Sequence, residues 1–302
     1  YTVAKLGRLA EYAVHSAKSG RITHLWNTWL LGIPFLADSV IVYKIISFAA
    51  LLFDALGFFI LLKNHAGKNI AYVSVLLFFA ISTLSPYHNL LAAYALCHQI
   101  PVGLMLFSLN FFLNSFMGRK KSNIAISTVL FLMSCMIYEA FIVFIVFFAV
   151  IAFVKNRCHK NNKLNVNNFL RDFLPYAVVS AAYTAIYFVW RIFYPTAYDG
   201  NQFYVHEPFL SLKTVYHYSV SFSPVFEFFD MVSKHQLGLH EFLSLLTIGS
   251  IFKAMLISVI FFKVMQKISL KCSDYVLLLM SFAGIFMPNI IVGFTEKYVN
   301  WE

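Results

Sequence analysis

IAISTVLFLMSCMIYEAFIVFIVFFAVIAFV, residues 124–154, is an unbroken apolar run with a single acid, Glu139, near its centre. Basic clusters flank the run, with Arg119-Lys120-Lys121 before it and Lys155-Asn156-Arg157 after it. As one helix the run would be about 46 Å long, whereas the hydrocarbon core of a bilayer is about 30 Å thick. Because Lys and Arg beside membrane spans favour the cytoplasmic side, both flanks favour the same side. The run is therefore predicted to fold back on itself as a hairpin.

The arms of this predicted hairpin are Ile124–Ile137 and Ala140–Val154, with the turn at Tyr138–Glu139. Each arm reaches only about 21–23 Å, so the tip is expected to stop short of the far membrane surface. A carboxylate and the free backbone groups of a turn are tolerated at that depth only inside protein or beside a water-filled cavity. We therefore expect a polar pocket that opens to the outside. The alternative is one tilted or kinked span, which would reverse the orientation of every later segment.

Composition indicates a polytopic membrane protein. The chain is 60% hydrophobic and only 12% charged, about half the charge of a soluble domain, and its mean hydropathy is +0.74. The net charge of +10 comes from Lys and Arg in short runs between apolar segments, so nucleic acid is not an expected partner. The four cysteines form no CxxC pair, which argues against a disulfide framework or a zinc site. No cofactor is firmly implied, and a divalent metal is not indicated.

The predicted fold is an all-α, polytopic transmembrane helical bundle with about six full spans and the short-helix hairpin. The spans lie at about 39–62, 70–86, 90–113, 173–194, 242–264 and 275–294. Placing the basic loops between them in the cytoplasm is consistent only if residues 124–154 turn back. We expect one transmembrane domain over residues 1–302. It begins with an outer interfacial segment (1–38) and membrane helices (39–194). A long outer loop (195–241), further membrane helices (242–294) and an outer tail (295–302) follow.

The first twenty residues are predicted to form an amphipathic helix along the outer membrane surface. Its apolar face is Leu6, Ala10, Ala13 and Ala17, and its polar face is Lys5, Arg8, Tyr12 and His15. This helix is either an interfacial anchor or a means of bringing Lys5 and Arg8 to a phosphate, since Arg grips phosphate through paired hydrogen bonds.

The long outer loop is acidic and aromatic, and loops of this length in compact proteins are often functional. Two of its segments, Tyr198-Asp199-Gly200 and His206-Glu207-Pro208, carry groups that could act as a base or bind a metal. Each segment is also an ordinary kind of loop sequence. Their chemistry therefore stays open at this point.

Glu139 is the main candidate for a functional residue, because a carboxylate among apolar residues of a membrane protein is costly and marks a functional position by default. The alternative is a structural ion pair, for which Lys253 and Arg191 are the available partners. Asp54 and Lys44, both inside the first span, point to different faces and do not pair with each other. Asp54 is interpreted as structural.

Several features together resemble the GT-C class of polytopic glycosyltransferases, especially the bacterial membrane glucosyltransferases that decorate O-antigen. One is Gly7-Arg8 in an outer amphipathic helix, and another is the pair of short helices with Tyr138-Glu139 at its turn. The others are the long aromatic outer loop and Lys297-Tyr298 just after a late span. The resemblance covers most of the 302 residues by topology.

The resemblance implies that a sugar is transferred from polyprenyl phosphate to a cell-surface glycan or lipid acceptor, on the extracytoplasmic side of a bacterial inner membrane. By this resemblance Arg8 and Lys297 would face phosphate, and Tyr138-Glu139 would line the acceptor or sugar site, with Glu139 the candidate catalytic carboxylate. Lys5, Asp199 and Tyr298 are further candidates for substrate binding. The catalytic acid of the family's first outer loop has no counterpart here, and we expect it upstream of Tyr1, with the chain a piece of a longer protein.

Two other functions remain open. A transporter or flippase for lipid-linked or small solutes would suit a polytopic bundle, but such proteins have paired repeats with matching Gly/Pro breaks. The breaks here, at Gly32-Ile33-Pro34, Ile100-Pro101 and Met287-Pro288, show no such symmetry. The third interpretation is a non-catalytic membrane subunit.

Overall fold

The computed structural model describes residues 8–35, 39–81, 96–118, 121–158, 166–195 and 206–220, together with eleven single positions between 249 and 294. These residues form helices and no strand, which confirms the all-α class for the part described. Within these described residues, four helical segments are long and apolar enough to cross a membrane: Val40–His65, Gln99–Phe116, Glu139–Asn156 and Val166–Phe193. The chain is a membrane protein with at least these candidate spans. The full count of six stays a prediction, because the spans predicted at 242–264 and 275–294 lie almost wholly outside the described residues.

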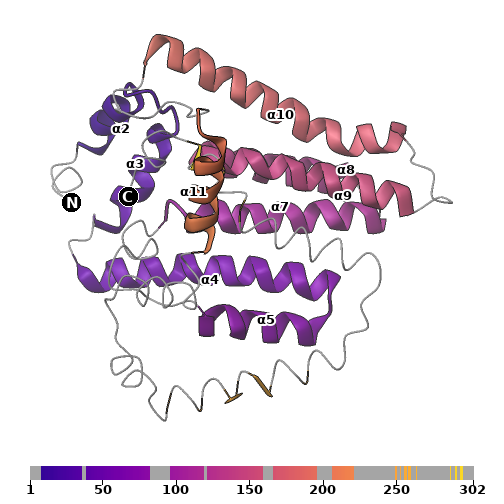
Figure 1. The fold of residues 1–302 in the computed structure, drawn as a ribbon. Helices are drawn as coiled ribbons and strands as arrows, with labels where there is room; N and C mark the ends of the chain where they lie inside the picture. Colours follow the sequence, from indigo (N-terminus) through magenta and orange to yellow (C-terminus); the bar gives the residue numbers. More distant parts are fainter. Residues whose placement is uncertain are drawn as a thin grey trace. The chain divides into compact units, whose positions relative to one another are not determined.

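Internal contacts divide the chain into two units, residues 1–64 with 84–202 and residues 65–83 with 203–302. The first unit carries, in chain order, α2 (Leu9–Ala17), α3 (His24–Gly32), η1 (Ile33–Phe35), α4 (Val40–His65), α7 (Gln99–Gly118), α8 (Lys121–Ile137), η2 (Glu139–Phe144), α9 (Ile145–Cys158) and α10 (Val166–Phe193). The second unit carries α5 (Lys68–Ile81) and α11 (Pro208–Val220). Figure 1 labels these helices along the chain. A single domain over the whole length stays a prediction.

The apolar run at 124–154 does reverse direction. The Phe131 ring in α8 and the Phe148 ring in α9 lie 5.1 Å apart, centroid to centroid. In one continuous helix these residues would be about 25 Å apart. The two arms therefore lie side by side, as Figure 1 also shows. The predicted hairpin is confirmed, and the single kinked span is excluded.

The second arm is longer than predicted. It begins as a 3₁₀ helix at Glu139 and continues as α9 to Cys158, into the basic cluster. Because a 3₁₀ turn rises about 2 Å per residue, this arm spans about 33 Å, whereas α8 spans about 25 Å. An arm of that length matches the bilayer core, so the expectation of two equally short arms is wrong.

Hydroxyl groups and aromatic rings hold the first unit's core together. Ser108 in α7 and Ser127 in α8 each donate to the other's backbone carbonyl, at 2.7 and 2.6 Å, and the Tyr176 hydroxyl of α10 donates to Ser127 Oγ at 2.6 Å. Small residues of this kind let membrane helices approach closely while satisfying their hydrogen bonds. The Tyr176 ring stacks on Phe148 at 4.1 Å and meets Phe112 edge-on at 5.1 Å. One tyrosine therefore joins α7, α8, α9 and α10.

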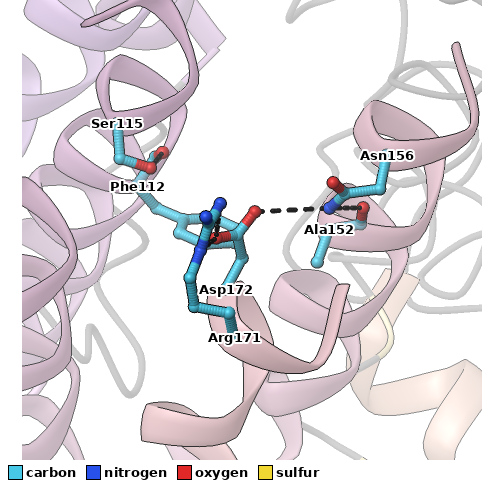
Figure 2. Close-up of polar contacts among 6 residues, drawn as sticks. All are labelled: Phe112, Ser115, Ala152, Asn156, Arg171 and Asp172. Atoms are coloured by element: carbon cyan, nitrogen blue, oxygen red, sulfur yellow. Dashed lines mark hydrogen bonds and ion pairs between the residues drawn. The ribbon is translucent and has the colours of Figure 1, made fainter. Parts of the chain in front are cut away.

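A buried carboxylate joins α9 to α10 at the end opposite the hairpin tip. Asp172 Oδ1 accepts hydrogen bonds from Arg171 Nε at 3.0 Å and Nη2 at 2.9 Å, and Asn156 Nδ2 donates to Asp172 Oδ2 at 3.3 Å (Figure 2). Both oxygens of this buried acid have partners, as a buried charge requires. Asp172 belongs to α10, which begins seven residues earlier than the predicted span at 173–194.

Other predicted boundaries also shift. The span predicted at 90–113 corresponds to α7, which begins at Gln99 and ends at Gly118. The span predicted at 70–86 is described as α5 up to Ile81, and its last residues lie outside the described part. The predicted outer loop contains the helix α11, whose first residue is Pro208. Proline suits that position because the first turn needs no amide donor and the ring presets the helical φ.

Candidate polar site at the hairpin tip

The helical hydrogen bonding of the hairpin stops at Tyr138. Its backbone is extended, with φ −142° and ψ 112°, so α8 ends at Ile137 and a new helical segment begins at Glu139. Glu139 therefore stands in the first turn of that segment, where the unpaired amides favour a negative charge. The break sets Glu139 at the tip of the hairpin, as the sequence predicted.

The Glu139 carboxylate has two partners from the segment that joins α2 to α3. Arg21 Nε lies 3.2 Å from Oε1, and the Thr23 hydroxyl donates to Oε2 at 3.0 Å. The Arg21 side chain is 37% exposed and that of Glu139 is 15% exposed, whereas the Nε atom that meets Glu139 is itself buried. Glu139 does form an ion pair, but its partner is Arg21 and not Arg191, one of the two partners that the sequence offered. Lys253 lies outside the described residues.

A glycine turn brings Arg21 to the hairpin tip. After α2 the chain passes through Gly20 at φ +100°, a backbone conformation that glycine adopts without strain. Ser19 Oγ donates to the Ser16 carbonyl at 2.6 Å, and the Gly20 amide donates to the Ala17 carbonyl at 3.2 Å, which closes the helix end. The chain then reverses into α3, with Arg21 and the buried Thr23 facing Glu139.

The reversal is fixed by close packing between α2 and α3. The buried face of α2 is Leu9, Ala13 and Ala17. A Cβ on Gly32 of α3 would lie 2.5 Å from Leu9 Cδ2, so only glycine fits there without a shift. The predicted amphipathic helix is confirmed over Leu9–Ala17, but Ala10 is exposed and Leu9 takes its place on the apolar face. Leu6 lies outside the described residues.

Helix α10 forms another wall of the site. The phenols of Tyr183 and Tyr187 lie within electrostatic range of the Glu139 carboxylate, and Arg21 hydrogen-bonds to Tyr187. One turn further along, Trp190 Nε1 donates to the Ala17 carbonyl at 2.9 Å, which ties α10 to the end of α2. Arg191 lies close enough to Tyr187 to interact with it electrostatically. We define the tip site as Arg21, Thr23, Glu139, Tyr183 and Tyr187.

Two histidines border the tip site. Burial and the neighbouring Arg21 lower the pKa of His24 below its usual 6.5, with Glu139 acting in the opposite direction. His98 meets the Tyr138 ring edge-on, with centroids 5.1 Å apart, and burial lowers its pKa as well. The tip site therefore combines a paired carboxylate, a guanidinium, hydroxyl groups and histidines that stay neutral at pH 7. Such a set can hold hydroxyl groups and an anionic oxygen at the same time.

Arg8, His206 and Glu207 are the other candidate residues that lie in the described part of the chain. Arg8 is exposed at the start of α2, at the opposite end of that helix from Arg21. His206 and Glu207 are exposed beside Pro208, and the Glu207 carbonyl accepts from the Ser211 amide at 3.1 Å. Lys5, Asp199, Lys297 and Tyr298 lie outside the described residues, so their roles stay predictions. Within the described part, no three His, Cys, Asp or Glu side chains gather to hold a metal ion.

No family model, curated protein or solved structure matches the chain. Its function must therefore be inferred from the tip site. Tyr138 and Glu139 were predicted from the sequence, whereas Arg21, Thr23, Tyr183 and Tyr187 were not. A signal for the tyrosines was present: Tyr176, Ser180, Tyr183 and Tyr187 recur at helical spacing within an apolar span, which puts them on one face.

Proposed function

We propose that the chain is an integral membrane glycosyltransferase, which moves a sugar from a polyprenyl-phosphate donor to a cell-surface glycan or lipid acceptor on the extracytoplasmic side. The observation that carries the proposal is the Arg21–Glu139 pair, formed by two partly exposed side chains at the tip of a membrane hairpin. A donor of this kind presents an anionic phosphate and a hydroxyl-rich sugar together, and the acceptor adds a further hydroxyl. In the tip site, the Arg21 guanidinium suits the phosphate, and the Glu139 carboxylate and the tyrosine hydroxyls suit the hydroxyl groups of the sugar and the acceptor.

In this reaction the bond between the sugar's anomeric carbon and the phosphate oxygen breaks, and a glycosidic bond to the acceptor oxygen forms. The acceptor hydroxyl loses its proton to a carboxylate, and the polyprenyl phosphate leaves as an anion. Glu139 supplies a carboxylate that takes this proton or holds a sugar hydroxyl. Arg21, the ion-pair partner of Glu139, supplies a cation for the departing phosphate.

The test is transfer of radiolabelled hexose from a panel of undecaprenyl-phosphate hexoses to the envelope glycan, in membranes that contain the full-length protein. Glu139→Gln is expected to lower the transfer rate by at least about 100-fold at unchanged abundance, as losing a transition-state charge does. The matched control is Glu11→Gln, which removes the same charge from an exposed position on α2 and should leave the rate within about twofold.

Two outcomes would overturn the proposal. One is a near-normal rate for Glu139→Gln. The other is movement of the labelled lipid across reconstituted vesicles without any transfer of sugar, which would instead support a transporter or flippase.

A further inference from the structure

Two neighbouring hydroxyl groups on α10 are buried without a hydrogen-bond partner among the described residues. They are Ser180 Oγ and the Tyr183 hydroxyl, in side chains that belong to residues only 7% and 8% exposed. Leaving a buried hydroxyl unsatisfied costs about 1–3 kcal/mol, and native proteins contain few such groups. Within a membrane protein the cost is harder to avoid, because lipid offers no hydrogen bonds. Two such groups on one helix face need an explanation.

Their neighbours on the same face are both satisfied. Tyr176, one turn before Ser180, donates to Ser127 Oγ at 2.6 Å, and Tyr187, one turn after Tyr183, is hydrogen-bonded to Arg21. The unsatisfied pair therefore lies between Tyr176, in a closed structural network, and Tyr187, which is held by Arg21. Of the two unsatisfied residues, Tyr183 is the one that interacts electrostatically with Glu139 and Cys135 of the hairpin. The polar face of α10 thus continues from the tip site inward, and Ser180 and Tyr183 have no hydrogen-bond partner in the part of the chain that the structure describes.

We propose that Ser180 and Tyr183, with Glu139, form a subsite for the hydroxyl groups of a neutral sugar. A phenol donates and accepts, a serine hydroxyl does the same, and a carboxylate accepts two or more hydrogen bonds. This combination matches vicinal hydroxyls, which each donate and accept. The Glu139 charge is already matched by Arg21, so the subsite favours an uncharged hexose over an acidic one. The inference rests on the proposed function, since it assigns the part of the donor or acceptor that the site binds.

A ligand-binding role and a structural role of the Tyr183 hydroxyl predict different effects of Tyr183→Phe. If the Tyr183 hydroxyl has no partner in the resting protein, Tyr183→Phe removes an unsatisfied group and leaves the stability unchanged or raises it. The same variant should weaken binding of the sugar, because it removes one hydrogen bond to the ligand. A structural hydroxyl would give the reverse result, with lower stability and unaltered binding.

The experiment compares binding of undecaprenyl phosphate with binding of the undecaprenyl-phosphate hexose panel by titration calorimetry, using the full-length protein in nanodiscs. For the wild type, at least one hexose should raise the affinity over that of the bare lipid phosphate. Tyr183→Phe should reduce this added affinity about 5- to 10-fold while binding of the bare lipid stays the same. Ser180→Ala should act in the same direction. Tyr12→Phe, at an exposed position on α2, is the matched control and should have no effect.

The proposal is wrong if no hexose adds affinity, if Tyr183→Phe leaves the added affinity intact, or if Tyr183→Phe lowers the melting temperature as Ser127→Ala does. None of these measurements requires sugar transfer. A protein that binds the hexose through Tyr183 but transfers none would refute the glycosyltransferase and keep the subsite.

Discussion

Glu139 Oε1 and Arg21 Nε are 3.2 Å apart, and this ion pair joins the hairpin tip to the segment between α2 and α3. The contact links a residue from the middle of the chain to one near its beginning. Glu139 is therefore not an isolated charge. Its carboxylate is paired with the Arg21 guanidinium and the Thr23 hydroxyl.

The first prediction concerns this ion pair. Because Arg21 is more than one-third exposed, its pairing with Glu139 should be worth only about 0.5–1 kcal/mol. A double-mutant cycle of Arg21→Gln and Glu139→Gln, measured as the free energy of unfolding in mixed micelles, should return that coupling energy. Arg171→Gln combined with Glu139→Gln is the control, and those two effects should add, since the residues lie at opposite ends of the bundle. Additive effects for Arg21 and Glu139 would mean that the pair does not form.

The second prediction concerns pH. The pKa of His24 is lowered in the folded protein, so the unfolded chain binds a proton at this position more readily. The contribution of His24 to stability is then greatest above pH 6.5, decreases as the pH falls through that value, and levels off below the folded pKa. His24→Asn should remove this part of the decrease in unfolding experiments from pH 7.5 to pH 5. Identical pH profiles for His24→Asn and the wild type would contradict it.

The partners of His24 allow a sharper version of that test. Arg21 lowers the pKa of His24 and Glu139 raises it. Arg21→Gln should therefore raise the histidine pKa, and Glu139→Gln should lower it further. Opposite shifts of the His24 imidazole resonance in an NMR titration would confirm both assignments, and shifts of the same sign would show that the pKa has another cause.

The third prediction concerns the sidedness of the hairpin. Ser122 at the start of α8 and Lys155 near the end of α9 are both exposed and lie at the same end of the hairpin. Single cysteines at these positions, in a background without the native cysteines, should both resist an impermeant maleimide added outside intact cells. Lys18→Cys, near the tip site, should react. Reaction of Ser122→Cys and Lys155→Cys with failure of Lys18→Cys would invert the orientation of the hairpin.

The sequence was sufficient to predict the hairpin because both of its determinants are local. The length of the apolar run and the basic clusters at its ends depend on residues 119–157 alone. The partner of Glu139 was not predictable in this way. Arg21 reaches Glu139 only because Gly20 turns the chain and Leu9 packs on Gly32, and these are contacts between segments that the sequence does not pair. Charge complementarity alone offered Lys253 and Arg191 as partners. Lys253 lies outside the described residues, and Arg191 lies one turn beyond Tyr187.

The last prediction concerns the packing of α4 on α7, where two glycines differ in the space around them. A Cβ on Gly103 would lie 2.3 Å from the Phe53 ring and 2.9 Å from Asp54 Oδ1, and a ring held in a packed interface cannot move aside easily. A Cβ on Gly57 would meet Leu106 Cβ at 3.2 Å, which requires only a small shift. Overpacking of a filled interface typically costs about 1–3 kcal/mol.

Gly103→Ala should therefore lower the free energy of unfolding by about 1–3 kcal/mol, and Gly57→Ala by clearly less. Thermal unfolding of the two variants in the same detergent measures the difference. Because both changes add one methyl group and raise helix propensity equally, only the local space distinguishes them. Equal melting temperatures would show that α4 and α7 do not approach each other at Gly103. A larger loss for Gly57→Ala would show that the two helices pack in a different register.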